Sequence, residues 1–173
     1  MNNTRQFNYQ NRPQWQIDLI NKYPLIYRVP NPILKDYFNE ETYQKLINDP
    51  YFCNLRFGFE CDEGWAELIG KYSNAAFEVL HILDRLYPGT FDSGKYYIRA
   101  FIIKEKFGGI RFQNNVFIPY PFEQLFAAFT RELEGQSFII CELTGESGSL
   151  CEKDGVYKTL SPAKAKELGY TEL

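Results

Sequence analysis

Residues 102–112 read IIKEKFGGIRF, and this stretch carries the clearest signal for the fold. Two runs of strand-forming residues flank a pair of glycines, which predicts a β-hairpin over residues 95–118. If Gly108–Gly109 forms a two-residue turn, Lys106 lies opposite Arg111 on the neighbouring strand.

Alternation of side chains gives the hairpin two unlike faces. One face carries cations and an amide, namely Lys104, Lys106, Arg111 and Gln113. The other face is apolar and carries Phe101, Ile103, Phe107, Ile110 and Phe112, with Glu105 as the exception. Like charges that face each other across two strands repel, so solvent or an anion must relieve them. Two interpretations stay open: a solvated face whose charges protect the sheet edge, or a site for an anionic ligand or an acidic partner.

The longest helix is predicted over residues 62–86, where apolar residues recur at helical spacing and Trp65 is expected in the core. Further helices are expected at 13–22, 40–48 and 121–134 and from Ser161 onward. Residues 23–34 are expected to be extended and 51–60 to be a strand. This mixture predicts an α+β fold: an antiparallel sheet with one long amphipathic helix packed on it, plus a small C-terminal ribbon-like β module. We expect a core domain over 1–136 and the module over 137–173.

The composition of the 173-residue chain is that of a globular protein, with 45% hydrophobic and 24% charged residues. The formal net charge of −3 argues against a nucleic-acid-binding surface over the whole molecule but allows a local basic patch. The polar N-terminus does not resemble a signal peptide, and no apolar run approaches the ~18 residues of a membrane helix. These features predict a cytoplasmic protein outside the membrane. Its four cysteines are expected to be free thiols, and a disulfide, such as one between Cys141 and Cys151, is the alternative.

Candidate catalytic residues are few. His81 is the single histidine, which excludes a site with several histidine ligands, and we expect it to be a partly exposed helix residue. Glu60, Asp62 and Glu63 lie at the start of the long helix, where carboxylates cap free N–H groups and face the positive end of the helix dipole. The same three carboxylates are the candidates for general acid–base chemistry.

Two stretches resemble a widespread, functionally uncharacterised family of small bacterial and bacteriophage proteins. They are RFGFECDEGWAELI at 56–69 and IKEKFGGIRF at 103–112. The C-terminal segment that begins IICELTGESGSL resembles the closing module of the same family, so that the likeness covers about residues 51–165. The resemblance implies a zinc-ribbon-like C-terminal module and a bacterial or phage setting, and it names no activity.

The closing module departs from the pattern of the resembled family at the metal site. A structural zinc site needs four nitrogen or sulfur ligands. Here Cys141 occupies the first ligand position, whereas Thr144, Ser161 and Lys164 occupy the other three. Cys151 adds a second thiol, which leaves the set short of four. The sequence therefore predicts a ribbon without stoichiometric zinc, no other metal site and no cofactor. In place of a metal, apolar packing then has to stabilise the fold of the module. The residues expected to pack are Ile139, Ile140, Leu150, Val156, Tyr157 and Leu160.

Two classes of function are consistent with these observations. The first is a non-catalytic accessory protein of a phage or bacterium that binds a host protein, a nucleic acid or a nucleotide-like ligand. Its binding residues would be Lys104, Lys106 and Arg111, with Glu60 as a candidate to face them, and the resemblance implies interference with a host process such as antiviral defence. The second is an enzyme of unrecognised type that acts on a phosphate-containing substrate with an acidic residue as acid or base. The lack of a complete catalytic set favours the binding protein.

Overall fold

The structure is a computed structural model of the chain, and it describes residues 11–29, 32–48, 55 and 58–173. The N-terminal part forms α1 (Gln14–Lys22), α2 (Pro24–Tyr27), α3 (Pro32–Lys35) and α4 (Glu40–Asn48). The central part forms β1 (Phe59–Glu60), the 3-10 helix η2 (Glu63–Trp65), α5 (Ala66–Leu86), α6 (Thr90–Ser93), β2 (Tyr97–Lys106), β3 (Gly109–Phe117) and α7 (Phe122–Gln136). The C-terminal part forms η3 (Ser137–Ile139), β4 (Ser149–Lys153), β5 (Val156–Leu160), α8 (Pro162–Leu168) and β6 (Thr171–Glu172).

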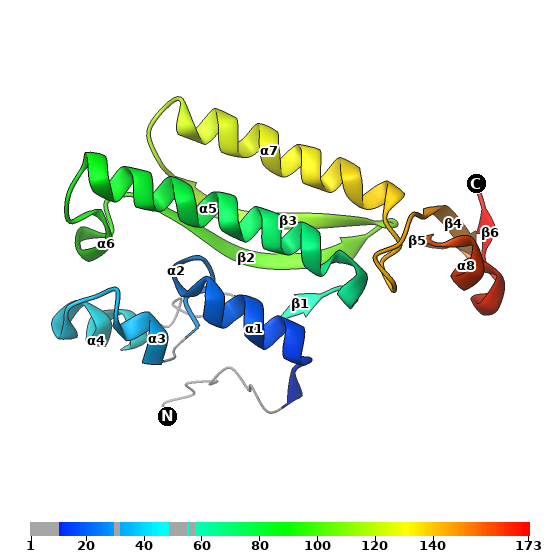
Figure 1. Ribbon diagram of the computed structural model, residues 1–173, viewed down its shortest axis with the longest axis horizontal. Coiled ribbons are helices and arrows are strands. Elements are labelled where there is room, and N and C mark those ends of the chain that lie inside the picture. The colour runs from blue at the N-terminus through cyan, green and yellow to red at the C-terminus, as the bar shows by residue number, and fades with distance from the viewer. Residues whose placement is uncertain (1–10, 30–31, 49–54, 56–57) are drawn as a thin grey trace.

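The first sheet has the strand order β1-β2-β3, with β1 parallel to β2 and β2 antiparallel to β3. Figure 1 shows α5 and α7 running side by side across β2 and β3. Tyr72 of α5 joins the layers, because its ring stacks on Phe112 of β3 at a centroid distance of 4.4 Å and lies 5.4 Å from Phe126 of α7. The predicted α+β fold with a long helix packed on an antiparallel pair is confirmed, and β1 adds a parallel strand.

The sequence of α5 explains why this helix is the main element of the core. Its buried side chains recur every three or four residues and are Leu68, Ile69, Tyr72, Ser73, Ala76, Leu80 and Leu83. Trp65, in the turn before the helix, is fully buried, as predicted. The expected capping role of Asp62 is wrong in one respect: Asp62 occupies the N-cap position of η2, but its side chain makes no capping hydrogen bond.

The N-terminal part agrees with the prediction only in part. Two predicted helices are confirmed as α1 and α4. The extended segment expected over 23–34 is wrong, because Pro24 and Pro32 each begin a one-turn helix. Proline suits a first helical position, since its fixed φ matches the helix and the N–H there has no helical partner. The strand expected over 51–60 lies mostly outside the described residues, and within them it is confirmed for Phe59–Glu60.

The hairpin of β2 and β3 is confirmed, but its turn lies one residue earlier than predicted, which shifts the predicted pairing of the strands by two residues. The turn consists of Phe107 and Gly108, which both have left-handed backbone conformations with φ of 55° and 79°. A two-residue turn of type I′ requires positive φ at both positions. Lys104, not Lys106, therefore lies opposite Arg111. The three cations still share one face, because the shift leaves the alternation within each strand unchanged.

Two contacts explain why the turn lies at Phe107–Gly108. Glu105, the polar exception on the apolar face, accepts a hydrogen bond from the Gly108 N–H at 2.7 Å. Gly109 stays in the strand, where Phe138 packs against it so closely that a Cβ would lie 2.5 Å from the Phe138 Cζ. The two glycines therefore serve different purposes, one in the turn and one in packing. Phe107 consequently lies exposed at the tip, not on the apolar face.

The last turn of α7 and the residue that follows it cover part of the outer edge of β3. The Ile110 N–H donates to Ser137 Oγ at 2.9 Å, and the Phe112 N–H donates to Glu134 Oε1 at 3.0 Å. Free N–H groups on an edge strand invite pairing with another chain. These two hydrogen bonds occupy donors that would otherwise face outward.

The C-terminal module, defined here as residues 137–173, contains a second sheet with the order β5-β4-β6. Its core consists of Cys141, Cys151, Leu160 and Ala165, with Leu143 and Tyr170 packed against it. Of the predicted packing residues, Leu160 is buried in this core, as predicted, whereas Ile139, Val156 and Tyr157 are exposed because Cys141, Cys151 and Ala165 occupy the other buried positions. The described cysteines, Cys61, Cys141 and Cys151, are free thiols, as predicted, and Cys53 lies outside the described residues.

The C-terminal module packs on the start of α5 (Figure 1). The Trp65 Nε1–H donates to Ile140 O at 2.8 Å, and the Gly64 N–H donates to Glu142 O at 2.8 Å. The approach is so close that a Cβ on Gly64 would lie 2.2 Å from the Cys141 carbonyl oxygen. Glycine at this position is therefore required by the docking of the module.

The same module holds the tip of the hairpin. Thr159 Oγ1 donates to Gly108 O at 2.6 Å. A Cβ on Gly108 would lie 2.3 Å from Leu150 Cδ1, so the module also packs tightly here. The Gly-Trp pair and the Gly-Gly pair, which stood out in the sequence, are therefore both explained by contacts with the C-terminal module.

Candidate anion-binding face

The side of the first sheet that faces away from α5 and α7 forms the candidate site, and we call it the open face. Ile103 and Phe112 point toward the helices, so the residues that alternate with them point to the other side. A β-bulge between Ala100 and Ile102 shifts the alternation of β2 by one residue. The open face consists of Tyr97, Arg99, Ile102, Lys104, Lys106, Arg111, Gln113, Asn115 and Phe117.

Three cations occupy the half of the open face near the hairpin tip. Lys106 is exposed, and the half-buried Lys104 and Arg111 lie directly opposite each other. Arg111 Nη1 donates to Ile110 O at 2.7 Å, and its guanidinium lies 5.5 Å from the ring centroid of Phe138. Among the residues that the structure describes, none of the three cations forms an ion pair. The repulsion between Lys104 and Arg111 is therefore not relieved by a described carboxylate.

Glu60 lies at the margin of these cations. β1 pairs with β2 so that Glu60 lies beside Lys104, rather than beside Lys106 or Arg111. Glu60 is exposed, and in the described part of the chain it forms no ion pair. The structure thus brings together the four residues proposed from the sequence, with three on the open face and one at its border.

The other half of the open face carries aromatic rings, which the sequence reasoning missed. Tyr97 and Phe117 lie opposite each other with ring centroids 5.9 Å apart, and Phe117 is 57% exposed. The guanidinium of Arg99 lies 4.2 Å from the ring centroid of Tyr97. A signal was present in β2, where Tyr97 and Arg99 flank the apolar Ile98. Such alternation is typical of a strand with one solvated face.

A buried arginine adds positive charge near the aromatic half. Arg28, at the end of α2, is only 6% exposed. Its Nε donates to Leu25 O at 3.3 Å, and its guanidinium lies 5.8 Å from the ring centroid of Phe38. Burial, together with the nearby charge of Arg99, lowers the pKa of Arg28 to about 9. Two arginine side chains, Arg28 and Arg99, therefore lie near each other at this end of β2.

A second charged cluster lies between the core and the C-terminal module, and we call it the junction cluster. It consists of Glu142, whose Oε2 accepts a hydrogen bond from Lys158 Nζ at 2.8 Å, and Asp62, whose Oδ2 lies 3.8 Å from the same Nζ. Burial raises the pKa of Glu142, and Lys158 opposes this shift only in part. Burial lowers the pKa of Lys158, but the nearby Glu142, Asp62 and Glu105 outweigh it, so the Lys158 pKa is raised. These charges compensate one another within the protein.

The carboxylates proposed for acid–base chemistry are separated by the fold. Glu60 borders the open face, Asp62 belongs to the junction cluster, and Glu63 is exposed in η2. His81 is half-buried and packs against two aromatic rings, one from α5 and one from α6, at centroid distances of 4.2 Å and 5.3 Å. The structure therefore assigns these residues to different surroundings rather than to one catalytic set.

The four positions that hold zinc in the resembled family lie close together. Burial alone raises the pKa of the Cys141 thiol, but hydrogen bonds from the Thr144 hydroxyl and from the backbone N–H groups of Ser161, Thr144 and Leu143 outweigh it, so the pKa is lowered. Lys164 lies near enough to interact electrostatically with Cys141. Among the described residues, no group of three His, Cys, Asp or Glu side chains is placed to hold a metal ion. The absence of zinc stays a prediction, which elemental analysis of the purified protein tests.

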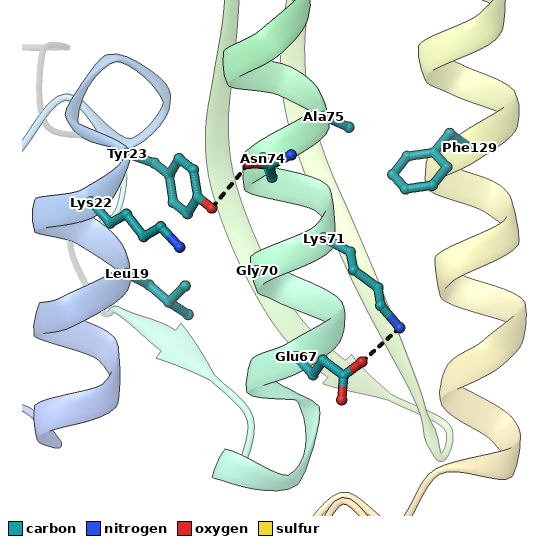
Figure 2. Close-up of a pocket in the computed structure, with 9 residues that line it drawn as sticks. All are labelled: Leu19, Lys22, Tyr23, Glu67, Gly70, Lys71, Asn74, Ala75 and Phe129. Atoms are coloured by element: carbon teal, nitrogen blue, oxygen red, sulfur yellow. Dashed lines mark hydrogen bonds and ion pairs between the residues drawn. The ribbon is translucent and has the colours of Figure 1, made fainter.

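A groove of ≈500 Å³ lies between α1, α5 and α7, as Figure 2 shows. It is lined by Leu19, Lys22, Tyr23, Glu67, Gly70, Lys71, Asn74, Ala75 and Phe129. Lys71 pairs with Glu67 at 2.8 Å, and the Tyr23 hydroxyl donates to Asn74 Oδ1 at 3.4 Å. Because α5 separates the groove from the sheet, its residues provide matched controls for substitutions on the open face.

Comparisons with models of known protein families, with curated protein sequences and with solved structures find no match to this chain. The family resemblance described above therefore stays a hypothesis. In the part of the chain that the structure describes, no helix has both the length and the apolar character needed to cross a membrane.

Proposed function

We propose that this protein is a non-catalytic binding protein that recognises an anionic ligand or partner through the open face. The observation that carries the proposal is the set of three cations, Lys104, Lys106 and Arg111, on one face without a described ion-pair partner. Lys158, which lies in the second sheet, is by contrast compensated by two carboxylates.

The chemistry of the three cations suits phosphate or carboxylate groups. The guanidinium of Arg111 offers several N–H donors in a planar fork, whereas the two lysines act as compact charges on flexible stems. A bound anion would also relieve the repulsion between Lys104 and Arg111. Since the whole chain carries a net charge of −3, this attraction is local and directs the ligand to one face.

The test uses immobilised heparin as a polyanion probe. Lys104→Gln combined with Arg111→Gln should lower the salt concentration at which the protein elutes, because two contacts are lost. The control, Lys22→Gln combined with Lys71→Gln, removes the same charge from the groove and should elute like the wild type (Figure 2). Binding should weaken as salt rises, because exposed charges are screened over about 8–10 Å near physiological ionic strength.

Two results would contradict the proposal. The first is an equal shift for both pairs, which would mean that net charge alone determines retention. The second is a wild-type protein that does not bind heparin at about 50 mM salt, where polyanion contacts are strong. Thermal melting of each variant verifies folding, and the open-face pair should melt at or slightly above the wild-type temperature because a like-charge repulsion is removed.

The resemblance to bacterial and bacteriophage proteins supports a proposed setting in a bacterial cytoplasm. There the binding would interfere with a host process such as antiviral defence, with a host protein or a nucleic acid as the partner. The alternative is an enzyme that acts on a phosphate-containing substrate. The separation of Glu60, Asp62 and Glu63 in the structure does not favour this alternative.

A further inference from the structure

We propose that the ligand of the open face is single-stranded nucleic acid. In this arrangement its bases stack on Phe117 and Tyr97, and its phosphates contact Lys104, Lys106 and Arg111. The inference rests on the proposed function, because it names the class of anion that the same face binds.

The aromatic half of the open face is the observation that goes beyond charge. The rings of Tyr97 and Phe117 on the open face lie 5.9 Å apart. Two further rings adjoin them outside this face: Tyr96 lies 6.2 Å from Phe117, and Tyr87 lies 5.4 Å from Tyr96. Phe117 is 57% exposed and Tyr87 is 42% exposed, so the group presents ring surface to solvent. Nucleobases stack on such rings whatever their sequence, because every base has a π face.

Cations are interleaved with these rings. Lys95 Nζ lies 5.2 Å from the ring centroid of Tyr87 and 5.1 Å from that of Tyr96, and the guanidinium of Arg99 lies 4.2 Å from that of Tyr97. Cation–π contacts hold positive charge next to the aromatic surface. A nucleotide on this surface would therefore find a stacking partner for its base and the positive charge of Lys95 for its phosphate.

Amide side chains connect the two halves of the open face. Gln113 and Asn115 are exposed on β3 between Arg111 and Phe117. Each amide offers both donors and an acceptor, which are the groups that contact the edges of unpaired bases. Phosphate-binding, edge-binding and stacking groups thus follow one another along a single strand.

The dimensions and chemistry of this face favour a single strand over other anions. From Phe117 to Arg111 the strand advances six residues, about 20 Å at ~3.4 Å per residue, which suits a short extended segment. Bases in a duplex are already stacked on one another and are not available to the rings. An acidic peptide would use the cations but would leave the exposed aromatic group without a partner.

The first experiment measures fluorescence anisotropy of labelled oligothymidylate and oligouridylate of about 12 nucleotides, a length within the usual range of single-strand sites. Phe117→Leu should lower affinity about tenfold, the loss expected when one stacked base loses its ring. Phe129→Leu, which removes a ring from the groove on α7, should leave affinity unchanged (Figure 2). The two oligomers distinguish DNA from RNA as the source of the strand.

The second experiment addresses the phosphates and the strandedness. Lys104→Gln combined with Arg111→Gln should weaken oligonucleotide binding. It should also reduce the slope of log affinity against log salt concentration by about one to two, because fewer phosphate contacts release fewer counterions on binding. An unlabelled duplex of the same length should compete at least about tenfold less well than the single strand.

The outcomes separate this inference from the proposed function. A protein that binds heparin through the open face but binds neither oligonucleotide overturns the inference alone and points to an acidic protein segment. Phe117→Leu without effect, or equal competition by the duplex, also overturns the inference, because binding would then depend on charge only. Failure to bind both heparin and the oligonucleotides overturns both proposals.

Discussion

The charged side chains on the two sides of the hairpin tip differ in whether they form ion pairs. In the junction cluster, Lys158 is held between Glu142 and Asp62 at 2.8 Å and 3.8 Å. On the open face, Lys104 and Arg111 lie opposite each other without a described carboxylate partner.

Burial explains the difference. Glu142 is buried, and an unpaired buried charge costs several kcal/mol, so the junction cluster must be compensated for the protein to fold. Charges that contact water cost little when they are unpaired. The paired charges of the junction cluster therefore contribute to the stability of the fold, whereas the unpaired charges of the open face remain available to a ligand. Four predictions test this division, from the largest effect to the smallest.

The largest effect is expected for Trp65→Ala, on the junction side. The substitution removes a fully buried indole and its hydrogen bond to Ile140 O. We expect a loss of about 3–5 kcal/mol in the free energy of unfolding, as for other large aromatic deletions. Denaturant titration measures it, and a loss below about 1 kcal/mol would show that the indole does not anchor the module.

Gly64→Ala should have the next largest effect. Its Cβ would lie 2.2 Å from the Cys141 carbonyl oxygen, so the backbone of the module must move. A cost of about 2–3 kcal/mol is expected for such overpacking. Gly135→Ala is the control, because a Cβ there meets no atom within 4 Å and the helical position should gain about 0.5–1 kcal/mol. Equal unfolding midpoints for the two variants would mean that the junction is not closely packed.

A Lys→Met substitution in the junction cluster and another on the open face test directly whether paired and unpaired cations differ in their contribution to stability. Lys158→Met leaves Glu142 buried beside no described cation, and we expect a loss of about 2 kcal/mol, below the full cost of a buried pair because Lys158 is partly exposed. Lys106→Met on the open face should change stability by less than about 0.5 kcal/mol. Similar losses for both variants in urea titration would remove the distinction between structural and available cations.

The smallest effect concerns pH. Because the Glu142 pKa is raised in the folded protein, the folded chain holds this proton at pH values where the unfolded chain has released it. The contribution of this group to stability is therefore fully present below the usual carboxyl value of 4.5 and is lost as pH rises through the folded-state pKa. The difference in unfolding free energy between wild type and Glu142→Gln should fall over this range. A difference that grows with pH would show that Lys158 outweighs burial.

The elements that could be predicted from the sequence are those whose structure is determined by a periodic pattern of residues. The long helix, the burial of Trp65 and the hairpin all depend on apolar periodicity and turn residues within one segment. The register of the hairpin depended instead on Phe107 accepting a left-handed conformation and on Phe138 packing against Gly109. Phe138 lies about thirty residues away, so this contact could not be derived locally.

The candidate site was predictable to a similar degree. Lys104, Lys106 and Arg111 were placed on one face by alternation alone. The neighbour of Glu60 was not predictable, because it depends on a parallel pairing between segments separated by the whole of α5. Tyr97 and Arg99 were missed because the bulge in β2 changes which residues of this strand share a face with the cations, whereas Phe117 follows from Arg111 by alternation along β3.

The hydrogen bonds from Ile110 to Ser137 and from Phe112 to Glu134 affect how this protein can associate with others. Along this stretch of β3, a peptide or a second copy of the chain cannot extend the sheet by adding a strand, because the outward N–H donors are already used. Recognition at this edge must rely on side chains. Its specificity can therefore change by single surface substitutions while the backbone of the hairpin stays as it is.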